Sequence, residues 1–369
     1  MNGEFLRSKG NVCLVPSIPL FSQIFRPSLR SQLRKRFVRR KKTLPHRLLY
    51  NPVFGYGVQE HESQLSSAGV RPVSTARTNV LTQSSKFSAY LALTKPDVSF
   101  LVLMTTAAGF YMGSRGPVDW VRLSHVVFAT MMIAAGTAAL NHYIERASDL
   151  QMRRTASRPL PSGQLAPREA LIFGVVLCIA GAADLAIAAG HLACLLGIFT
   201  CLSYLLAYTP LKKRTVWATF VGAIPGAIPP MIGWAAATGK LDAGAWILFA
   251  ILFVWQFPHF HAIAWMYRED YARAGILMLP VVDKDGTRTY RQIILYAGSL
   301  VAISLLPSIL GLTGVLYFFG ALVSCTALVQ VCLWAAHSKT NTRAKWLMHA
   351  TVIHIPVLLG LMMYDKLPR

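Results

Sequence analysis

Apolar runs of about 20 residues, separated by short polar stretches, recur along the chain after residue 87. A run of this length is sufficient to cross the hydrocarbon core of a bilayer. Because lipid offers no partners for backbone N–H and C=O groups, each run is predicted to be an α-helix. The nine predicted spans are residues 88–113, 122–144, 169–189, 191–208, 217–238, 243–266, 291–312, 313–336 and 345–364.

The composition supports a membrane protein. Apolar residues make up 54% of the 369 residues and charged residues 14%, and the mean hydropathy is +0.45. A soluble domain carries about 25% charged residues and would have to hide every apolar run from water. The sequence therefore predicts an all-α polytopic membrane protein. The Gly- and Pro-rich stretch 222–230 is expected to kink one span beside a cavity.

Positive charge is concentrated at the N-terminus. Residues 1–86 carry 15 Lys and Arg against 3 acidic residues. An Arg- and Ser-rich, acid-poor start without a long apolar core is typical of a mitochondrial transit peptide. We therefore divide the chain into residues 1–86, a transit peptide with a flexible linker, and residues 87–369, the membrane domain. The basic run at 34–42 leaves nuclear or membrane-surface tethering as alternatives, but we expect no nucleic-acid partner.

The loops between spans differ in charge on the two sides of the membrane. Loops after the even-numbered spans carry 16 basic residues, and the opposite side with the C-terminal tail carries 5. The positive-inside rule places the N-terminus and the even-numbered loops on the cytoplasmic side, which in a mitochondrion is the matrix side. We therefore expect a mitochondrial inner-membrane protein whose polar loops face the matrix.

Three oxygen-bearing side chains follow one another at the end of the second span. Asn141, Glu145 and Asp149 are spaced by four residues, so on a helix they share one face. Ionisable groups at this depth are costly unless they serve a function. Carboxylate and amide oxygens suit Mg²⁺, which completes its coordination with water and substrate phosphates. A solvated helix end with capping acids is the alternative.

Three arginines follow this motif directly. Guanidinium groups of Arg153, Arg154 and Arg158 beside metal-binding carboxylates are natural partners of a diphosphate, which they can grip with two hydrogen bonds each. Some of these arginines also serve as topology signals. Carboxylates for a metal and arginines for a phosphate within one loop are more specific than either group alone.

Two further basic-side loops carry candidate side chains. Tyr208 and Lys212 are four residues apart and could hold diphosphate oxygens, although Pro210 predicts that the helix ends there. A lysine that merely extends toward the membrane surface is the alternative. In the later loop, His259 and His261 are two residues apart, so a helix points them in different directions and they cannot share one metal.

The chain resembles the UbiA-type membrane prenyltransferases over roughly residues 88–364. The first match is the stretch N-H-Y-I-E-R-A-S-D-L-Q-M-R-R-T-A-S-R-P-L, and the second is Y-T-P-L-K. The blocks W-Q-F-P-H-F and Y-R-E-D-Y-A-R-A-G-I-L-M-L-P resemble the heme O synthase branch in its mitochondrial form. The resemblance implies nine helices around a central cavity, with farnesyl diphosphate bound through Mg²⁺.

The resemblance also implies an activity and partners. Farnesyl would pass to a vinyl group of heme B, a substrate, to give heme O for heme A and cytochrome c oxidase, and a downstream heme-modifying enzyme could dock. Asp270 joins Asn141, Glu145 and Asp149 as a catalytic candidate, and the heme-binding candidates follow from W-Q-F-P-H-F. These heme-binding candidates are Trp255 and His259.

Two departures from the family pattern bear on the acceptor. Glu145 stands where most of the family has Asp, which keeps the charge but lengthens the side chain. The second acidic motif is reduced, because Ala274 lies four residues after Asp270 and the next acids are Asp283 and Asp285. This favours heme over an aromatic quinone precursor. The alternatives are a prenyltransferase with an aromatic acceptor and a non-catalytic heme transporter or scaffold.

Overall fold

The computed structural model describes residues 85–368, and the regular structure of this part is almost entirely helical. The long elements are α3 (Pro96–Gly113), α4 (Trp120–Asp149), α5 (Pro167–Asp184), α6 (His191–Leu202), α8 (Ala218–Ala227), α9 (Pro229–Thr238), α10 (Ala243–Met266), α13 (Thr287–Ile309), α14 (Val315–Ser338) and α15 (Asn341–Tyr364). The short elements are α2 (Lys86–Leu93), η1 (Leu185–Ala189), η2 (Ser203–Tyr208), α7 (Thr209–Leu211), α11 (Arg268–Arg273) and α12 (Leu279–Val282).

The described helices reproduce the predicted spans closely. Eight helices or continuous helix pairs are long and apolar enough to cross a membrane, and the bent pair α2 and α3 makes up to nine. The first span was predicted as one helix over 88–113, and this was wrong. The chain bends by 49° between α2 and α3, because Lys95 takes a left-handed φ of 48° and Pro96 starts the next helix.

Three other spans are irregular, and one of them is the span of α5, which ends in the π-helical segment η1. The Gly- and Pro-rich span divides into α8 and α9 at Ile228, as its composition predicted. The span that starts with α6 widens into the π-helical segment η2 and continues through α7. This span ends at Leu211, so the helix end predicted at Pro210 is confirmed to within one residue.

Helix α9 packs against α3 with the two backbones in close contact. A Cβ atom on Gly233 would lie 2.0 Å from the carbonyl oxygen of Thr106, and one on Gly109 would lie 2.0 Å from that of Pro230. Small residues are typical of membrane helix interfaces because they let backbones approach. Within an 18-residue stretch of the α8–α9 span, 72% is buried inside the protein. This contact therefore forms part of the protein interior.

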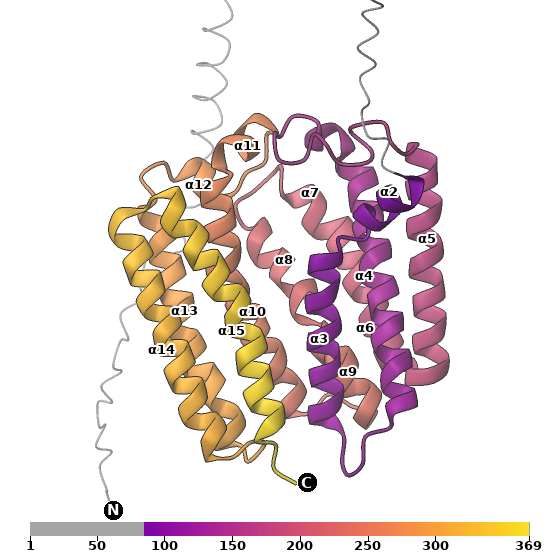
Figure 1. Ribbon diagram of the computed structural model, residues 1–369, viewed down its shortest axis with the longest axis vertical. Helices are drawn as coiled ribbons and strands as arrows, with labels where there is room; N and C mark the ends of the chain where they lie inside the picture. The colour runs from indigo at the N-terminus through magenta and orange to yellow at the C-terminus, as the bar shows by residue number, and fades with distance from the viewer. Residues whose placement is uncertain (1–84, 369) are drawn as a thin grey trace, which may run out of the picture. The chain divides into compact units, whose positions relative to one another are not determined.

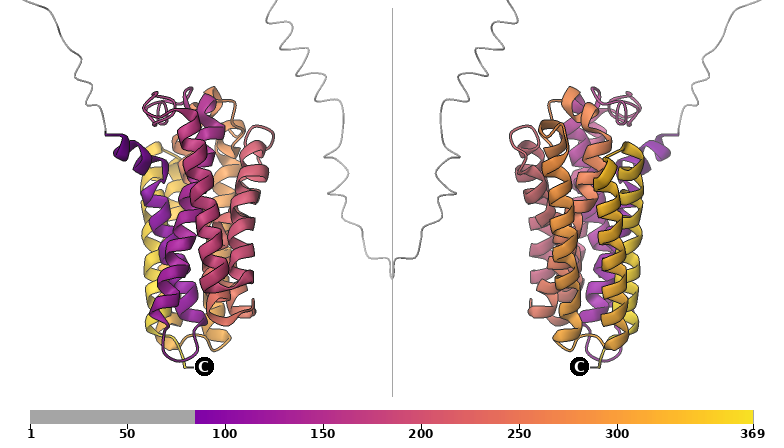
Figure 2. Two further views of the ribbon diagram at one scale, coloured as in Figure 1. Left: turned by 90° about the vertical axis from the view of Figure 1, so that its right-hand side faces the viewer. Right: turned by 90° about the vertical axis from the view of Figure 1, so that its left-hand side faces the viewer.

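The helices run between two ends that differ in polarity. Figure 1 shows α2, α7, α11 and α12 at one end and the C-terminus at the other, and Figure 2 shows the same arrangement from the sides. Exposed tryptophans occur near both ends: Trp217 and Trp346 at the first, Trp120 and Trp246 at the second. Tryptophan concentrates at the two membrane–water interfaces. The ends therefore correspond to the two surfaces of a bilayer.

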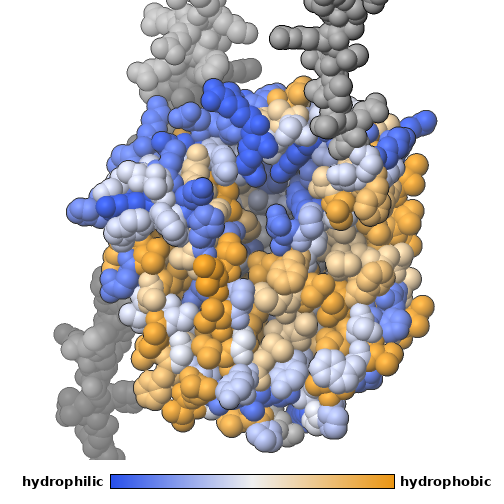
Figure 3. Space-filling view, in the orientation of Figure 1, coloured by the Kyte–Doolittle hydropathy of each residue, from blue (hydrophilic) through white to orange (hydrophobic). Residues whose placement is uncertain are grey.

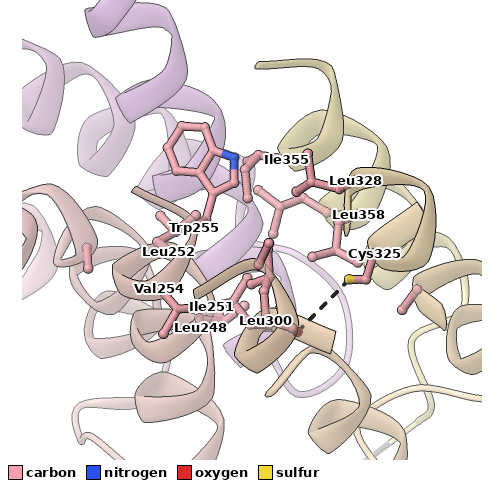
Figure 4. Close-up of a cluster of buried hydrophobic side chains, with 14 of the residues drawn as sticks. Leu248, Ile251, Leu252, Val254, Trp255, Leu300, Cys325, Leu328, Ile355 and Leu358 are labelled. Atoms are coloured by element: carbon pink, nitrogen blue, oxygen red, sulfur yellow. Dashed lines mark hydrogen bonds between the residues drawn. The ribbon is translucent and has the colours of Figure 1, made fainter. Parts of the chain in front are cut away.

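An apolar cluster joins the C-terminal helices to α10. Leu252 of α10, Leu300 of α13, Leu328 of α14 and Ile355 of α15 meet in it (Figure 4). Each of these side chains is at most 4% exposed. The thiol of Cys325 donates to the Leu300 carbonyl oxygen across 4.0 Å within the same cluster. This packing gives α10 a fixed wall on the side away from α8.

The α3–α9 contact generates a stability prediction. Gly233→Ala places a methyl group against backbone atoms of α3, which cannot move aside as a flexible side chain would. Overpacking of this kind costs about 1–3 kcal/mol, so the melting temperature in detergent should fall. Gly298→Ala in α13 is the control, because a Cβ there meets nothing within 4 Å. Equal melting temperatures for the two variants would contradict the close contact.

Candidate active site

The carboxylate motif lies wholly within α4, which runs on to Asp149. Asn141, Glu145 and Asp149 therefore lie about 6 Å apart along one face of the helix. Asn141 and Asp149 are each 1% exposed. Polar groups buried this deeply require partners, and each of the three has one from another segment of the chain.

Lys212 follows α7 and pairs with Glu145. Its Nζ donates to Oε1 at 2.9 Å and to Oε2 at 3.1 Å, and the two side chains are 9% and 13% exposed. The same Nζ lies 4.4 Å from the ring centroid of Tyr208 and 5.8 Å from that of Tyr204. Burial alone lowers the pKa of Lys212, but the two phenols and the carboxylate raise it above its ordinary value. Lys212 is therefore positively charged at neutral pH.

Arg158 pairs with Asp149 at the end of the motif. Its Nη1 donates to Oδ1 at 2.9 Å and to Oδ2 at 2.8 Å. The Thr155 hydroxyl donates to the Asp149 carbonyl oxygen at 2.8 Å, which stabilises the turns that bring Arg158 back. Arg153 and Arg154 are exposed, so of the three predicted arginines Arg158 is the one bound to the motif.

Asn141 contacts two residues that the sequence analysis missed. Lys95 Nζ donates to Asn141 Oδ1 at 3.2 Å, and Asn141 Nδ2 donates to Thr209 Oγ1 at 3.3 Å. One sequence feature could have pointed to Lys95 as a site residue: it is a basic residue directly before Pro96, the first residue of α3. Its position beside Asn141 depends on the packing of α3 against α4, which sequence spacing does not reveal.

Asp270 joins the loop after α10 to the loop after α4. One carboxylate oxygen accepts from the Arg154 main-chain N–H at 3.2 Å, and the other pairs with Arg273. The Arg154 guanidinium lies 4.8 Å from the centroid of the Tyr267 ring. Asp270 is 9% exposed, so it forms a buried link at the polar end rather than a free acid.

The next two acids have capping roles. Asp283 Oδ2 accepts from the main-chain N–H and the hydroxyl of Thr289, both at 2.7 Å. Asp285 Oδ2 accepts from the Thr287 hydroxyl at 2.6 Å. Both acids therefore stabilise the first turn of α13. This agrees with a second acidic motif that is reduced to Asp270.

The heme-binding candidates lie between α10 and α15. Trp255 Nε1 donates to the Thr351 carbonyl oxygen at 2.8 Å, and His259 Nδ1 bonds to the Thr351 hydroxyl at 2.9 Å. The two rings stack with centroids 5.0 Å apart. His261 Nε2 instead bonds to Gln292 of α13 at 2.9 Å. The two histidines therefore point to different helices, as their spacing predicted, and these hydrogen bonds lead away from the carboxylate motif.

The donor set of the motif fits a hard cation such as Mg²⁺. Among residues 85–368 no three His, Cys, Asp or Glu side chains converge on one point. An ion at the motif would therefore take at most two carboxylates, from Glu145 and Asp149, with the Asn141 amide oxygen beside them. Mg²⁺ accepts such a set because it keeps waters and binds substrate phosphates. Figure 3 shows polar side chains around a recess at this end of the protein.

Comparison with known proteins gives consistent matches. The model of the UbiA prenyltransferase family matches residues 102–353. A protoheme IX farnesyltransferase of Solibacter usitatus is 49% identical over 286 residues, which cover 75% of this chain and 98% of that protein. The protein of the same name in Koribacter versatilis is 42% identical, covering 81% and 99% of the two chains.

Solved structures share the fold at low sequence identity. A digeranylgeranylglyceryl phosphate synthase structure matches with a TM-score of 0.64 and 19% identity, covering 76% of this chain and 99% of that chain. A UbiA homolog from Archaeoglobus fulgidus bound to GPP and Mg²⁺ matches with a TM-score of 0.55 and 14% identity, covering 74% and 99%. At these identities the likeness concerns the fold alone.

The Glu145–Lys212 pair generates a stability prediction. Lys212→Met keeps the apolar stem but leaves a buried carboxylate without its cation, which is expected to cost about 3 kcal/mol. Lys212→Met with Glu145→Gln removes both charges and should recover most of the loss. Thermal unfolding of the purified protein in detergent measures both variants. The pairing would be wrong if the double variant were no more stable than the single one.

The pH dependence of this pair follows from the raised pKa of Lys212. A group whose folded pKa is raised contributes fully to stability below its unfolded pKa, about 10.4 for lysine. The contribution is lost only as the pH rises through the higher folded pKa. The melting-temperature difference between wild type and the double variant Lys212→Met with Glu145→Gln, in which neither position titrates, should therefore stay constant from about pH 6 to about pH 9. A difference that shrinks across this range would contradict the assignment.

Proposed function

The chain belongs to the UbiA prenyltransferase family, and on that premise we propose that it transfers farnesyl from farnesyl diphosphate to a vinyl group of heme B, forming heme O. The observation that carries the reaction type is the buried stripe Asn141, Glu145 and Asp149 with a basic side chain bonded to each residue. The choice of heme B as the acceptor rests on the similarity to protoheme IX farnesyltransferases, which extends over nearly the whole length of those proteins. The protein is a multi-pass membrane enzyme.

The reaction breaks the bond between the farnesyl carbon and the diphosphate and forms a carbon–carbon bond to the terminal vinyl carbon. The positive charge that this leaves on the inner vinyl carbon is then taken up by a water molecule, which loses a proton and remains as a hydroxyl group. Negative charge develops on the departing diphosphate, so cations placed there in advance lower the barrier. The allylic cation that forms reacts with water unless water is excluded and the acceptor is held in place. A site between the helices of a bundle, away from bulk water, would meet both requirements.

We propose that Mg²⁺ binds Asn141, Glu145 and Asp149, where it would supply charge neutralisation for the leaving diphosphate. Before substrate binds, Lys212 and Arg158 neutralise Glu145 and Asp149. When farnesyl diphosphate arrives, these two cations can exchange carboxylate oxygens for phosphate oxygens. The ion pairs thus hold the cations within a few ångströms of the place where they act.

Further groups extend this diphosphate site. Arg153 and Arg154 lie on the same loop as Arg158 and can reach outer phosphate oxygens, while Tyr208 stands beside Lys212. Asp270 positions the Arg154 backbone by accepting its N–H. For the acceptor we propose Trp255 and His259, which stack on each other beside α15 and belong to the W-Q-F-P-H-F block.

We propose a location in the mitochondrial inner membrane with the active-site loops facing the matrix. The support is the basic, acid-poor composition of residues 1–86 and the excess of basic residues in the loops at the active-site end. Residues 1–84 lie outside the described part of the chain. We propose that a downstream enzyme that modifies heme O binds to this protein. Heme O is apolar, so it would pass from one protein to the other within the membrane.

The acceptor is tested with purified protein in detergent. Farnesyl diphosphate and Mg²⁺ are supplied with either heme B or 4-hydroxybenzoate, and products are identified by mass spectrometry. Farnesylated heme is expected with the first acceptor and no prenylated product with the second. Prenylated hydroxybenzoate without heme O would overturn the acceptor, and a lack of product with both acceptors would overturn the enzymatic assignment.

The metal site is tested with Asp149→Asn, which removes one carboxylate while preserving side-chain shape. Loss of a preorganised electrostatic group typically costs about 100- to 1,000-fold in rate, and we expect a loss of at least that order in Mg²⁺-dependent heme O formation. Asp97→Asn is the control, since Asp97 is exposed in the first turn of α3. Because Asp149→Asn also breaks the ion pair with Arg158, activities are compared at a temperature at which both proteins remain folded. Near wild-type activity of Asp149→Asn would remove Asp149 from the site.

A further inference from the structure

Gln256 is a polar side chain within α10, 3% exposed, and its side-chain amide is held in one orientation. Its Nε2 donates to the Ala223 carbonyl oxygen at 2.9 Å and to the Leu252 carbonyl oxygen at 3.1 Å. These two bonds use both protons of the NH₂ group. The opposite orientation would direct Oε1 at two carbonyl oxygens, which repel it. Oε1 is therefore a fixed acceptor, and within residues 85–368 it has no donor bonded to it.

The Gln256 oxygen lies against Gly226 of α8, and the main chain of Gly226 supplies a second acceptor. A Cβ atom on Gly226 would lie 2.0 Å from Oε1. The Gly226 carbonyl oxygen receives no hydrogen bond within the α8–α9 span, because Pro229 and Pro230 lack the N–H group that would donate to it. Gly226 is nevertheless exposed. Two acceptors thus lie at an accessible point between α8 and α10, at a depth where unsatisfied polar groups are costly.

This point lies between the proposed diphosphate site and the proposed heme residues. Gly222 is one helical turn from Gly226, about 6 Å nearer the polar end. A Cβ atom on Gly222 would lie 2.5 Å from the ring of Tyr208, which belongs to the diphosphate site. On α10, Gln256 directly follows Trp255. The farnesyl carbon that reacts is attached to the diphosphate, so its reaction with heme is expected at about this depth.

The proposed reaction requires one water molecule at this depth. Water has to be kept from the allylic cation, yet one water must reach the later cation on the inner vinyl carbon. In that step the water oxygen forms a bond to this carbon, and one water proton passes to the departed diphosphate. If no water is held there, the same cation loses a proton from the neighbouring carbon to the diphosphate. The product is then an alkene without a hydroxyl group.

We propose that Gln256 is a positioning residue that holds this water through Oε1, together with the Gly226 carbonyl oxygen. The proposal rests on the proposed function, because the water matters only if a vinyl group is farnesylated. A water that donates both protons to these two oxygens keeps its lone pairs for the attack on carbon. A water fixed in one place can serve the second cation without general access of water to the first.

The test measures which product forms. Gln256→Met removes the amide and keeps a side chain of similar length, and the purified protein is supplied with farnesyl diphosphate, Mg²⁺ and heme B. Mass spectrometry separates heme O from farnesylated heme that is lighter by one water molecule. Loss of a hydrogen bond to the water should raise the ratio of dehydrated to hydroxylated product about tenfold. The sum of both products should stay close to that of wild type, because the ion pairs of the motif are unchanged.

Gly226→Ala tests the same oxygen without replacing Gln256. The added methyl group would take the position of Oε1, so the flexible glutamine side chain must turn its oxygen away. The proportion of dehydrated product should rise again, and this variant decides the question if Gln256→Met fails to fold. Gln256→Glu keeps an acceptor oxygen at the same position along the side chain and should still form mainly heme O.

Gln292→Met is the matched control. Gln292 is also a glutamine of a membrane helix, but its Oε1 is bonded to His261 Nε2 at 2.9 Å, so the product ratio should not change. An unchanged ratio in both Gln256→Met and Gly226→Ala would overturn the proposal. An equal fall of both products would also overturn it, because this is the result of a purely structural role. Wild-type protein that forms no farnesylated heme would instead overturn the proposed function.

Discussion

The candidate active site depends on one constraint: a carboxylate buried in a membrane protein needs a cation beside it. Glu145 and Asp149 lie on the inner face of α4, where solvation by water is largely lost. Lys212 and Arg158 come from two different loops to neutralise them. The loops after α4 and α7 are consequently held against the same helix face. The need to neutralise the buried carboxylates thus brings together the side chains that we propose for the reaction.

Irregular backbone carries these groups into place. The bend after α2 exposes Lys95 toward Asn141, and the π-helical segment η2 sets the register of Tyr208 and Thr209. Outside the site, glycine contacts between α3 and α9 let two backbones approach closely. The regular helices form the scaffold, and the irregular segments between them position several of the candidate active-site side chains. Such interruptions are tolerated at membrane depth where neighbouring helices satisfy the freed backbone groups.

Hydropathy was sufficient to predict the helices, because a bilayer demands long apolar segments with internally satisfied backbones. The span predicted at 243–266 coincides with α10. The motif on α4 was also predictable, since helical spacing fixes which residues share a face. Lys95 and Thr209 were not predicted, because their roles arise from contacts between segments distant in sequence. The bend was missed although Pro96 signals it locally, whereas the π-helical segment η2 has no such signal in the sequence.

The paired charges of the motif have a consequence for the order of binding. In the substrate-free protein each acid is balanced, so the site presents little net attraction to a stray ion of either sign. A divalent cation alone would leave Lys212 and Arg158 without counterions, and a diphosphate alone would leave Glu145 and Asp149 without theirs. Only their joint arrival keeps every charge compensated. In the proposed reaction, these ion pairs would therefore favour binding of the metal and the prenyl donor together over binding of either one alone.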